Sequence, residues 1–207
     1  MKGFPILVLL AMLASALSGH ALPPEGIWTN VEDAYFAEEE GRIKSADMFL
    51  QFRDDGFWRP LDAYGGIEGE WRSDPPADLK LLDKSGWAIG ATKLRRARPF
   101  ACWVSVRKFT DKADGNPDWS FTGNLPVFDQ GGRIAFPGSG LAPDVTLRMR
   151  NVTWSKGSRN KPSLVIYMHK DDPERAEAYS WASPDATLIG INLRWVQASC
   201  SPVEEQT

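Results

Sequence analysis

The chain has few of the residues on which most enzymes and miniature scaffolds depend. Its 207 residues include only two Cys and two His, too few for a disulfide-rich scaffold or a multi-ligand zinc site. It contains no nucleophile-elbow, Walker or dinucleotide-binding glycine motif. A net charge of -3 gives no electrostatic reason to expect nucleic-acid binding. We therefore lean towards a protein that is not an enzyme and binds no cofactor.

Residues 1–21 have the pattern of a secretory signal peptide. Lys2 supplies a positive start, residues 4–17 form an apolar run, and the small residues Gly19 and Ala21 fit a cleavage site. The run is shorter than the roughly 20 apolar residues of a membrane span, and no later run is longer. We therefore expect a secreted or periplasmic protein without a transmembrane anchor, in which residues 22–207 form a single domain.

The two cysteines, Cys102 and Cys200, are expected to form a disulfide bond in such an oxidising compartment. The bond would close a loop of about 100 residues, which the chain-entropy model associates with a large stabilisation. It would also staple the middle of the chain to its end, and this favours one domain over two. Two separate buried thiols are the alternative interpretation.

Short alternating segments, separated by Gly, Pro, Asn and Asp, predict an all-β antiparallel fold. Residues 48–59 predict a hairpin that turns at Asp54-Asp55-Gly56. One or two short helices are expected, over 31–42 and 172–178. The other predicted strands are 68–72, 87–94, 100–108, 119–122, 133–136, 145–154, 163–170 and 186–198.

The segment Gly26-Ile27-Trp28, followed by an antiparallel meander, resembles the first strand of the lipocalin-like (calycin) barrels. Residues 49–56 are similar to the second-strand hairpin of such barrels. The resemblance implies a meander that closes as a barrel, with Trp28 on its floor and Arg194 packed over that Trp. The strand spacing also allows a jelly-roll or lectin-like sandwich, which is the alternative fold.

Nine Trp residues make aromatic side chains the main candidates for a binding surface. Flat aromatic rings stack on apolar ligands and on the C–H faces of sugars. We expect Trp28, Trp103 and Trp195 to be structural. Tyr167 and His169 share one face of a predicted strand and can supply polar contacts. The predicted ligand-binding residues are Trp58, Tyr64, Trp71, Trp87, Tyr167 and His169.

Other polar motifs have simpler interpretations. Glu68 and Glu70 are weak candidates for a glycosidase pair, because i,i+2 residues on one strand rarely supply both catalytic carboxylates. The acidic cluster at 111–118 is typical of a turn rather than a calcium loop. The basic residues at 93–98 are typical of a charged loop. Asn151-Val152-Thr153 matches a glycosylation sequon, and because it lies inside a predicted strand we interpret it as a chance match, with glycosylation as the alternative.

Three functions remain open. The first is an exported binding protein that holds a small, largely apolar ligand in a barrel lumen. The second is a carbohydrate-active enzyme or carbohydrate-binding module with an aromatic groove. The third is a non-catalytic envelope or partner-binding domain. The sequence leaves the oligomeric state unknown.

Overall fold

The computed structural model describes residues 22–30, 48–62, 68–82, 86–173 and 175–203. These residues contain no helix, and hence none that is long and apolar enough to cross a membrane. The strands are β1 (Gly26–Thr29), β2 (Phe49–Phe52), β3 (Trp58–Leu61), β4 (Leu79–Leu82), β5 (Gly86–Ile89), β6 (Thr92–Lys93), β7 (Arg95–Ala97), β8 (Pro99–Asp111), β9 (Pro117–Phe128), β10 (Gln130–Phe136), β11 (Val145–Val152), β12 (Ser163–Lys170), β13 (Ala176–Ala182), β14 (Ile189–Asn192) and β15 (Val196–Pro202).

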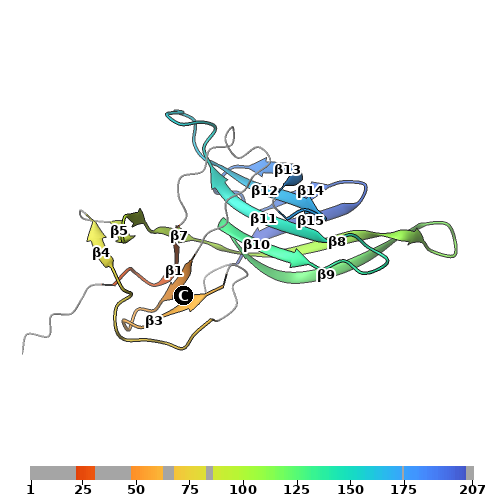
Figure 1. The fold of residues 1–207 in the computed structure, drawn as a ribbon. Coiled ribbons are helices and arrows are strands. Elements are labelled where there is room, and N and C mark those ends of the chain that lie inside the picture. The colour runs from red at the N-terminus through yellow and green to blue at the C-terminus, as the bar shows by residue number, and fades with distance from the viewer. Residues whose placement is uncertain (1–21, 31–47, 63–67, 83–85, 174, 204–207) are drawn as a thin grey trace, which may run out of the picture.

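Two four-stranded antiparallel sheets pack face to face as a sandwich (Figure 1). One sheet has the order β10-β11-β12-β13 and the other the order β14-β15-β8-β9. Alternate residues of both sheets, such as Leu147, Ile166 and Val104, form the shared core. This alternation is what a sheet with one buried face requires. The antiparallel all-β prediction is therefore confirmed.

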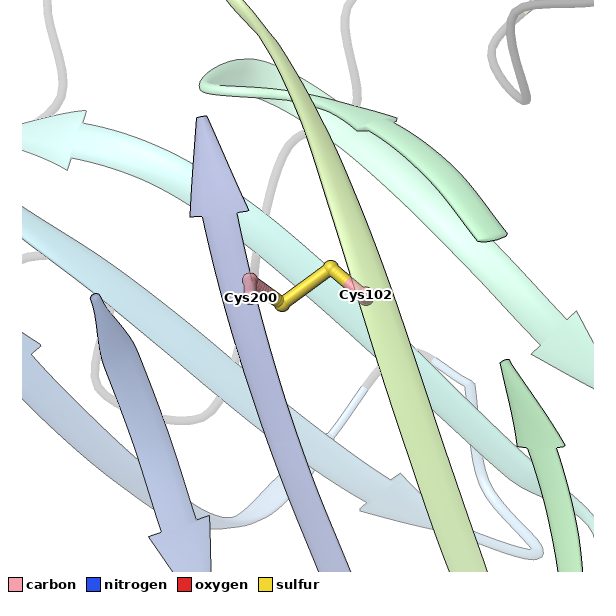
Figure 2. Close-up of a disulfide and its surroundings, with 2 residues drawn as sticks. All are labelled: Cys102 and Cys200. Carbon is pink, nitrogen blue, oxygen red and sulfur yellow. A yellow bond between two sulfur atoms is a disulfide. The ribbon is translucent and has the colours of Figure 1, made fainter. Parts of the chain in front are cut away.

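The predicted disulfide bond joins Cys102 and Cys200, which are 98 residues apart in sequence. Figure 2 shows the bond crossing between the neighbouring strands β8 and β15. The two residues lie directly opposite each other in the strand register, and both are buried in the sandwich core. The bond therefore ties the last described strand to the middle of the chain.

Two smaller sheets, β3-β2-β1-β7 and β4-β5-β6, lie beside one end of the sandwich (Figure 1). Phe49 of β2 contacts Phe128 at the end of β9, with ring centroids 4.9 Å apart. Leu61 and Ala97 complete this small core cluster. The predicted hairpin at 48–59 is confirmed, and Gly56 adopts the positive φ of 85° that its turn requires. This sheet is thus fastened to the sandwich through Phe128.

The predicted closed barrel is wrong, because none of the sheets formed by the described residues closes on itself. Each sheet instead keeps two edge strands, and the two larger sheets bury their apolar faces against each other. Trp28 lies on β1 opposite Arg96 of β7. Arg194 is exposed at the β14–β15 turn, in another sheet. The packing of Arg194 over Trp28 that the resemblance implies therefore does not occur.

The predicted helix at 172–178 is also wrong. Pro173 lies in a turn, and residues 176–178 of the predicted helix are the start of β13. In this strand small residues such as Ala182 face the core, and Tyr179 and Trp181 face outward. The other predicted helix, at 31–42, lies outside the described residues. The predicted strand at 68–72 forms only a single bridge between Arg72 and Trp58. The predicted strand at 186–198 is in fact the hairpin of β14 and β15.

Candidate functional site

Two of the predicted ligand-binding tryptophans are core residues. Trp58 and Trp87 are 7% and 6% exposed. The ring of Trp58 stacks on Phe52, with centroids 6.4 Å apart, and its indole N–H donates to the backbone oxygen of Asp74. Trp87 lies on β5 of the small β4-β5-β6 sheet. Their rings therefore present little area to a ligand. Tyr64 lies outside the described residues.

Trp71 is half-exposed, but two guanidinium groups lie over its ring. The centroid is 4.9 Å from Cζ of Arg53 and 4.4 Å from Cζ of Arg59. Such cation–π contacts orient a ring as part of the fold. Glu68 and Glu70 line the shallow cleft of about 580 Å³ beside Trp71. In this cleft the ring of Trp71 is already covered by two guanidinium groups, and the lining side chains carry charges of both signs.

Tyr167 and His169 lie on the outer face of the β10–β13 sheet, and both are buried. The prediction that they face away from Leu164, Ile166 and Met168 is confirmed, because those three residues belong to the sandwich core. His169 borders a cavity of about 470 Å³. The other lining residues are Arg133, Ala135, Phe136, Pro137, Asp144, Val145, Thr146, Asp171, Asp172 and Pro173.

The residues predicted to surround one ligand are thus divided between different sheets. Trp58 and Trp87 belong to the two small sheets, and Trp71 forms part of a cleft beside β3. Tyr167 and His169 belong to the sandwich. The structure does not gather them around one lumen.

An aromatic pair that the sequence analysis missed lies on the outer face of the β14-β15-β8-β9 sheet. Trp103, predicted to be structural, is 38% exposed, and Phe121 of β9 is 67% exposed. Their rings stack with centroids 5.9 Å apart and an interplanar angle of 29°. We call Trp103 and Phe121 the first aromatic platform. Trp103 points outward because its neighbours Cys102 and Val104 point into the core.

A cleft of about 320 Å³ adjoins the first aromatic platform. Its lining residues are Trp103, Gly190, Ile191, Asn192, Gln197 and Ala198. The strand register places Asn192, Gln197, Ser105 and Phe121 in one row across the sheet. Trp103, Ser199 and Gly190 form the neighbouring row. The carboxamides of Asn192 and Gln197 and the ring of Trp103 therefore line the same cleft, and Phe121 stacks on Trp103 beside it.

Gly190 is one of the residues that line this cleft. It faces outward on β14, and a Cβ atom built there would lie 3.0 Å from the backbone oxygen of Ala198. A side chain at this position would crowd the backbone of β15. Gly190 therefore lines the cleft without adding a side chain to it.

The lining of the cleft is uncharged and combines apolar residues with two carboxamides. Asn192 and Gln197 each offer a carbonyl acceptor and an N–H₂ donor, and the indole of Trp103 offers a flat face. None of the lining residues carries a charge. Among the residues that the structure describes, no group of His, Cys, Asp and Glu is arranged to hold a metal ion. The arrangement suits a ligand with both C–H faces and hydroxyl groups.

No protein-family model matches the chain, and no curated protein or solved structure is significantly similar to it. The lipocalin-like resemblance of Gly26-Ile27-Trp28 thus gains no support from known proteins. The fold and the cleft alone define the class, which is a disulfide-stapled antiparallel β-sandwich with an aromatic surface cleft.

Proposed function

We propose that the protein is an exported carbohydrate-binding module that holds a neutral sugar chain in the cleft beside Trp103. The observation that carries this proposal is the exposed, stacked pair of Trp103 and Phe121 beside Asn192 and Gln197. Aromatic faces bind the C–H face of a pyranose ring, and carboxamides exchange hydrogen bonds with its hydroxyl groups. The absence of charge on the lining favours neutral sugars over acidic ones.

The barrel lumen of the first hypothesis is not available for this function, because the sheets are open. The carbohydrate-binding alternative does not need a lumen, since a sugar chain can lie along the outer face of a sheet. The aromatic surface it requires is Trp103 and Phe121 rather than Trp58 and Trp87, which are buried. Our proposal concerns binding alone, and we assign no catalytic role to the residues of the cleft.

The proposed export is supported by two features. Residues 1–21 have the sequence pattern of a signal peptide, and Cys102 and Cys200 are bonded, as is typical outside the reducing cytosol. An intact-mass measurement on protein expressed with its leader tests this. We expect a chain that begins at Leu22 and gains two hydrogens on reduction. A chain that retains residues 1–21, or that carries free thiols, would contradict the proposal.

Calorimetric titration with neutral linear hexasaccharides tests the proposed cleft. Suitable probes are cellohexaose, xylohexaose, mannohexaose and chitohexaose. We expect one or more of them to bind, and Trp103→Ala to weaken binding at the cleft about tenfold or more, which is about 1.4 kcal/mol. Phe109→Ala is the matched control, because Phe109 is another exposed aromatic residue of β8, about 20 Å along the strand from Trp103.

The outcomes separate the hypotheses. If Trp103→Ala and Phe109→Ala bind a hexasaccharide as the wild type does, the cleft is not the binding site. If the wild type binds none of the four sugars, a partner-binding domain becomes the better interpretation. Thermal melting of each variant shows whether the sandwich is intact. Because Trp103 is partly exposed, its truncation is expected to leave the fold in place.

A second candidate function is the binding of a small molecule in the cavity beside His169. Its volume of about 470 Å³ lies within the usual range for ligand sites. Ala135 and Thr146 lie in register with His169, and these small side chains leave the space open. Ala135→Leu is expected to fill the cavity and abolish the uptake of a fluorescent apolar probe. Unchanged probe uptake in this variant would exclude the cavity.

A further inference from the structure

A second exposed aromatic pair lies on the other sheet of the sandwich. Tyr179 and Trp181 of β13 are 41% and 63% exposed. Tyr179 lies opposite Tyr167 in the strand register, and Trp181 lies opposite Val165. Tyr167 and Val165 belong to the cluster on the outer face of this sheet. Tyr179 and Trp181, which we call the second aromatic platform, therefore lie on that outer face.

The two platforms have nearly the same ring geometry. The centroids of Tyr179 and Trp181 are 5.8 Å apart with an interplanar angle of 31°. The corresponding values for Trp103 and Phe121 are 5.9 Å and 29°. Tyr179 also contacts the buried ring of Tyr167, at 6.4 Å between centroids. The second platform is thus anchored in the sheet and presents a surface of the same kind as the first.

The platforms point away from each other because the sandwich core lies between them. Ile166 and Ala182 fill that core from the sheet of the second platform, and Cys102 and Val104 fill it from the other sheet. β13 is an edge strand of its sheet. Outward residues two apart on a strand are spaced by about 7 Å along it. The second platform is therefore an open strip along an edge, suited to a chain-like ligand.

We propose that the second aromatic platform binds the same neutral sugar chain as the first, so that one molecule of the protein bridges two chains. This inference rests on the proposed function, since the matching ring geometry is what identifies the ligand. Two sites on opposite faces cannot be reached by one short oligosaccharide. A long polysaccharide would instead be cross-linked by the protein, and binding at two sites would increase its apparent affinity.

The test combines stoichiometry with cross-linking. Calorimetry uses whichever of the four hexasaccharides binds, and turbidity uses the soluble polysaccharide built from the same sugar. We expect two hexasaccharide sites in the wild type and one each in Trp103→Ala and Trp181→Ala. The wild type and the Phe109→Ala control are expected to cross-link the polysaccharide. Both single variants are expected to bind it without cross-linking.

The results distinguish this inference from the proposed function. If Trp103→Ala abolishes all binding and Trp181→Ala changes nothing, the second platform is not a binding site, and the proposed cleft stands. If Trp181→Ala abolishes all binding and Trp103→Ala changes nothing, the cleft and the bivalent arrangement are both wrong. If the wild type binds no hexasaccharide, both proposals fail. Melting curves that match the wild type establish that each variant is folded.

Discussion

Arg98 and Asp129 form an ion pair that joins three parts of the sandwich. Nε of Arg98 lies 2.8 Å from Oδ2 of Asp129, and the backbone N–H of Arg98 donates to Oδ1 at the same distance. Asn151 of β11 donates its side-chain amide to Oδ2 at 3.0 Å. Asp129 is buried, so its charge is held by these donors rather than by water. The contact also occupies Asn151, which supports the interpretation of its sequon as a chance match.

Asp129→Ala is expected to destabilise the fold by about 2–3 kcal/mol. The substitution removes charge-assisted hydrogen bonds and leaves the amide of Asn151 without an acceptor that it now uses. The side chain of Arg98 is 39% exposed to water, which keeps the loss at the lower end for a buried pair. Chemical denaturation measures the change.

Asp55→Ala is the matched control for that variant, because Asp55 pairs with Arg53 at the surface. Removal of a surface pair is expected to cost less than about 1 kcal/mol. Equal losses of stability in the two variants would show that the buried position of Asp129 does not make its ion pair more important for the fold than a surface pair.

Replacement of both Cys102 and Cys200 by Ala is expected to cost about 4 kcal/mol of stability. The bond closes a loop of 98 residues, and its removal restores conformational entropy to the unfolded chain. Since both sulfurs are buried, reductant alone should attack the native wild type only slowly. A denaturation midpoint equal to that of the wild type would contradict the prediction.

The alternation of inward and outward residues along the chain was sufficient to predict the strands that bury one face in the core. It correctly divided residues 163–170 into a core face and a face carrying Tyr167 and His169. The same rule also determines the direction of Trp103. A cysteine in a core disulfide points inward, so Trp103, next to Cys102, must point outward. The first aromatic platform was therefore partly accessible from the sequence.

Other features depend on contacts that a local pattern does not contain. The turn between β14 and β15 lacks Gly and Pro, and it forms because Leu193 and Trp195 pack against the core. Asp172 and Pro173 resemble a helix start, yet the residues that follow alternate between small and large and form β13. Trp58 is buried against Leu50 and Phe52. Arg72 also returns to pair with it and lies over its ring, which neighbouring residues do not reveal.

The carboxamides of the cleft are expected to contribute to sugar binding separately from the rings. Asn192→Ala and Gln197→Ala should each weaken binding of the hexasaccharide at the cleft about fivefold, because a hydrogen bond contributes about 1 kcal/mol. Ser201→Ala is the control, since Ser201 is an exposed residue of β15 outside the cleft. If all three variants bind equally well, the hydroxyl groups of the ligand are not recognised by these amides.

The long β8–β9 hairpin, which extends beyond the other strands in Figure 1, carries a pH-dependent ion pair. Nζ of Lys108 donates to Oδ2 of Asp118 at 2.8 Å, and this hydrogen bond lowers the pKa of Asp118. A lowered carboxyl pKa stabilises the native state above the unfolded value of about 3.9. That stabilisation is lost as the pH falls through the native pKa.

Lys108→Met is therefore expected to raise the pKa of Asp118 towards its ordinary value, as followed by an NMR titration of the side-chain carboxyl groups. Asp114, in the loop of the same hairpin, provides the internal control. Its pKa is lowered by hydrogen bonds from the side chain and backbone of Asn116, which the substitution leaves in place. The titration midpoint of Asp114 should stay constant while that of Asp118 moves. A common shift of both midpoints would instead indicate a change in the net charge or conformation of the whole hairpin.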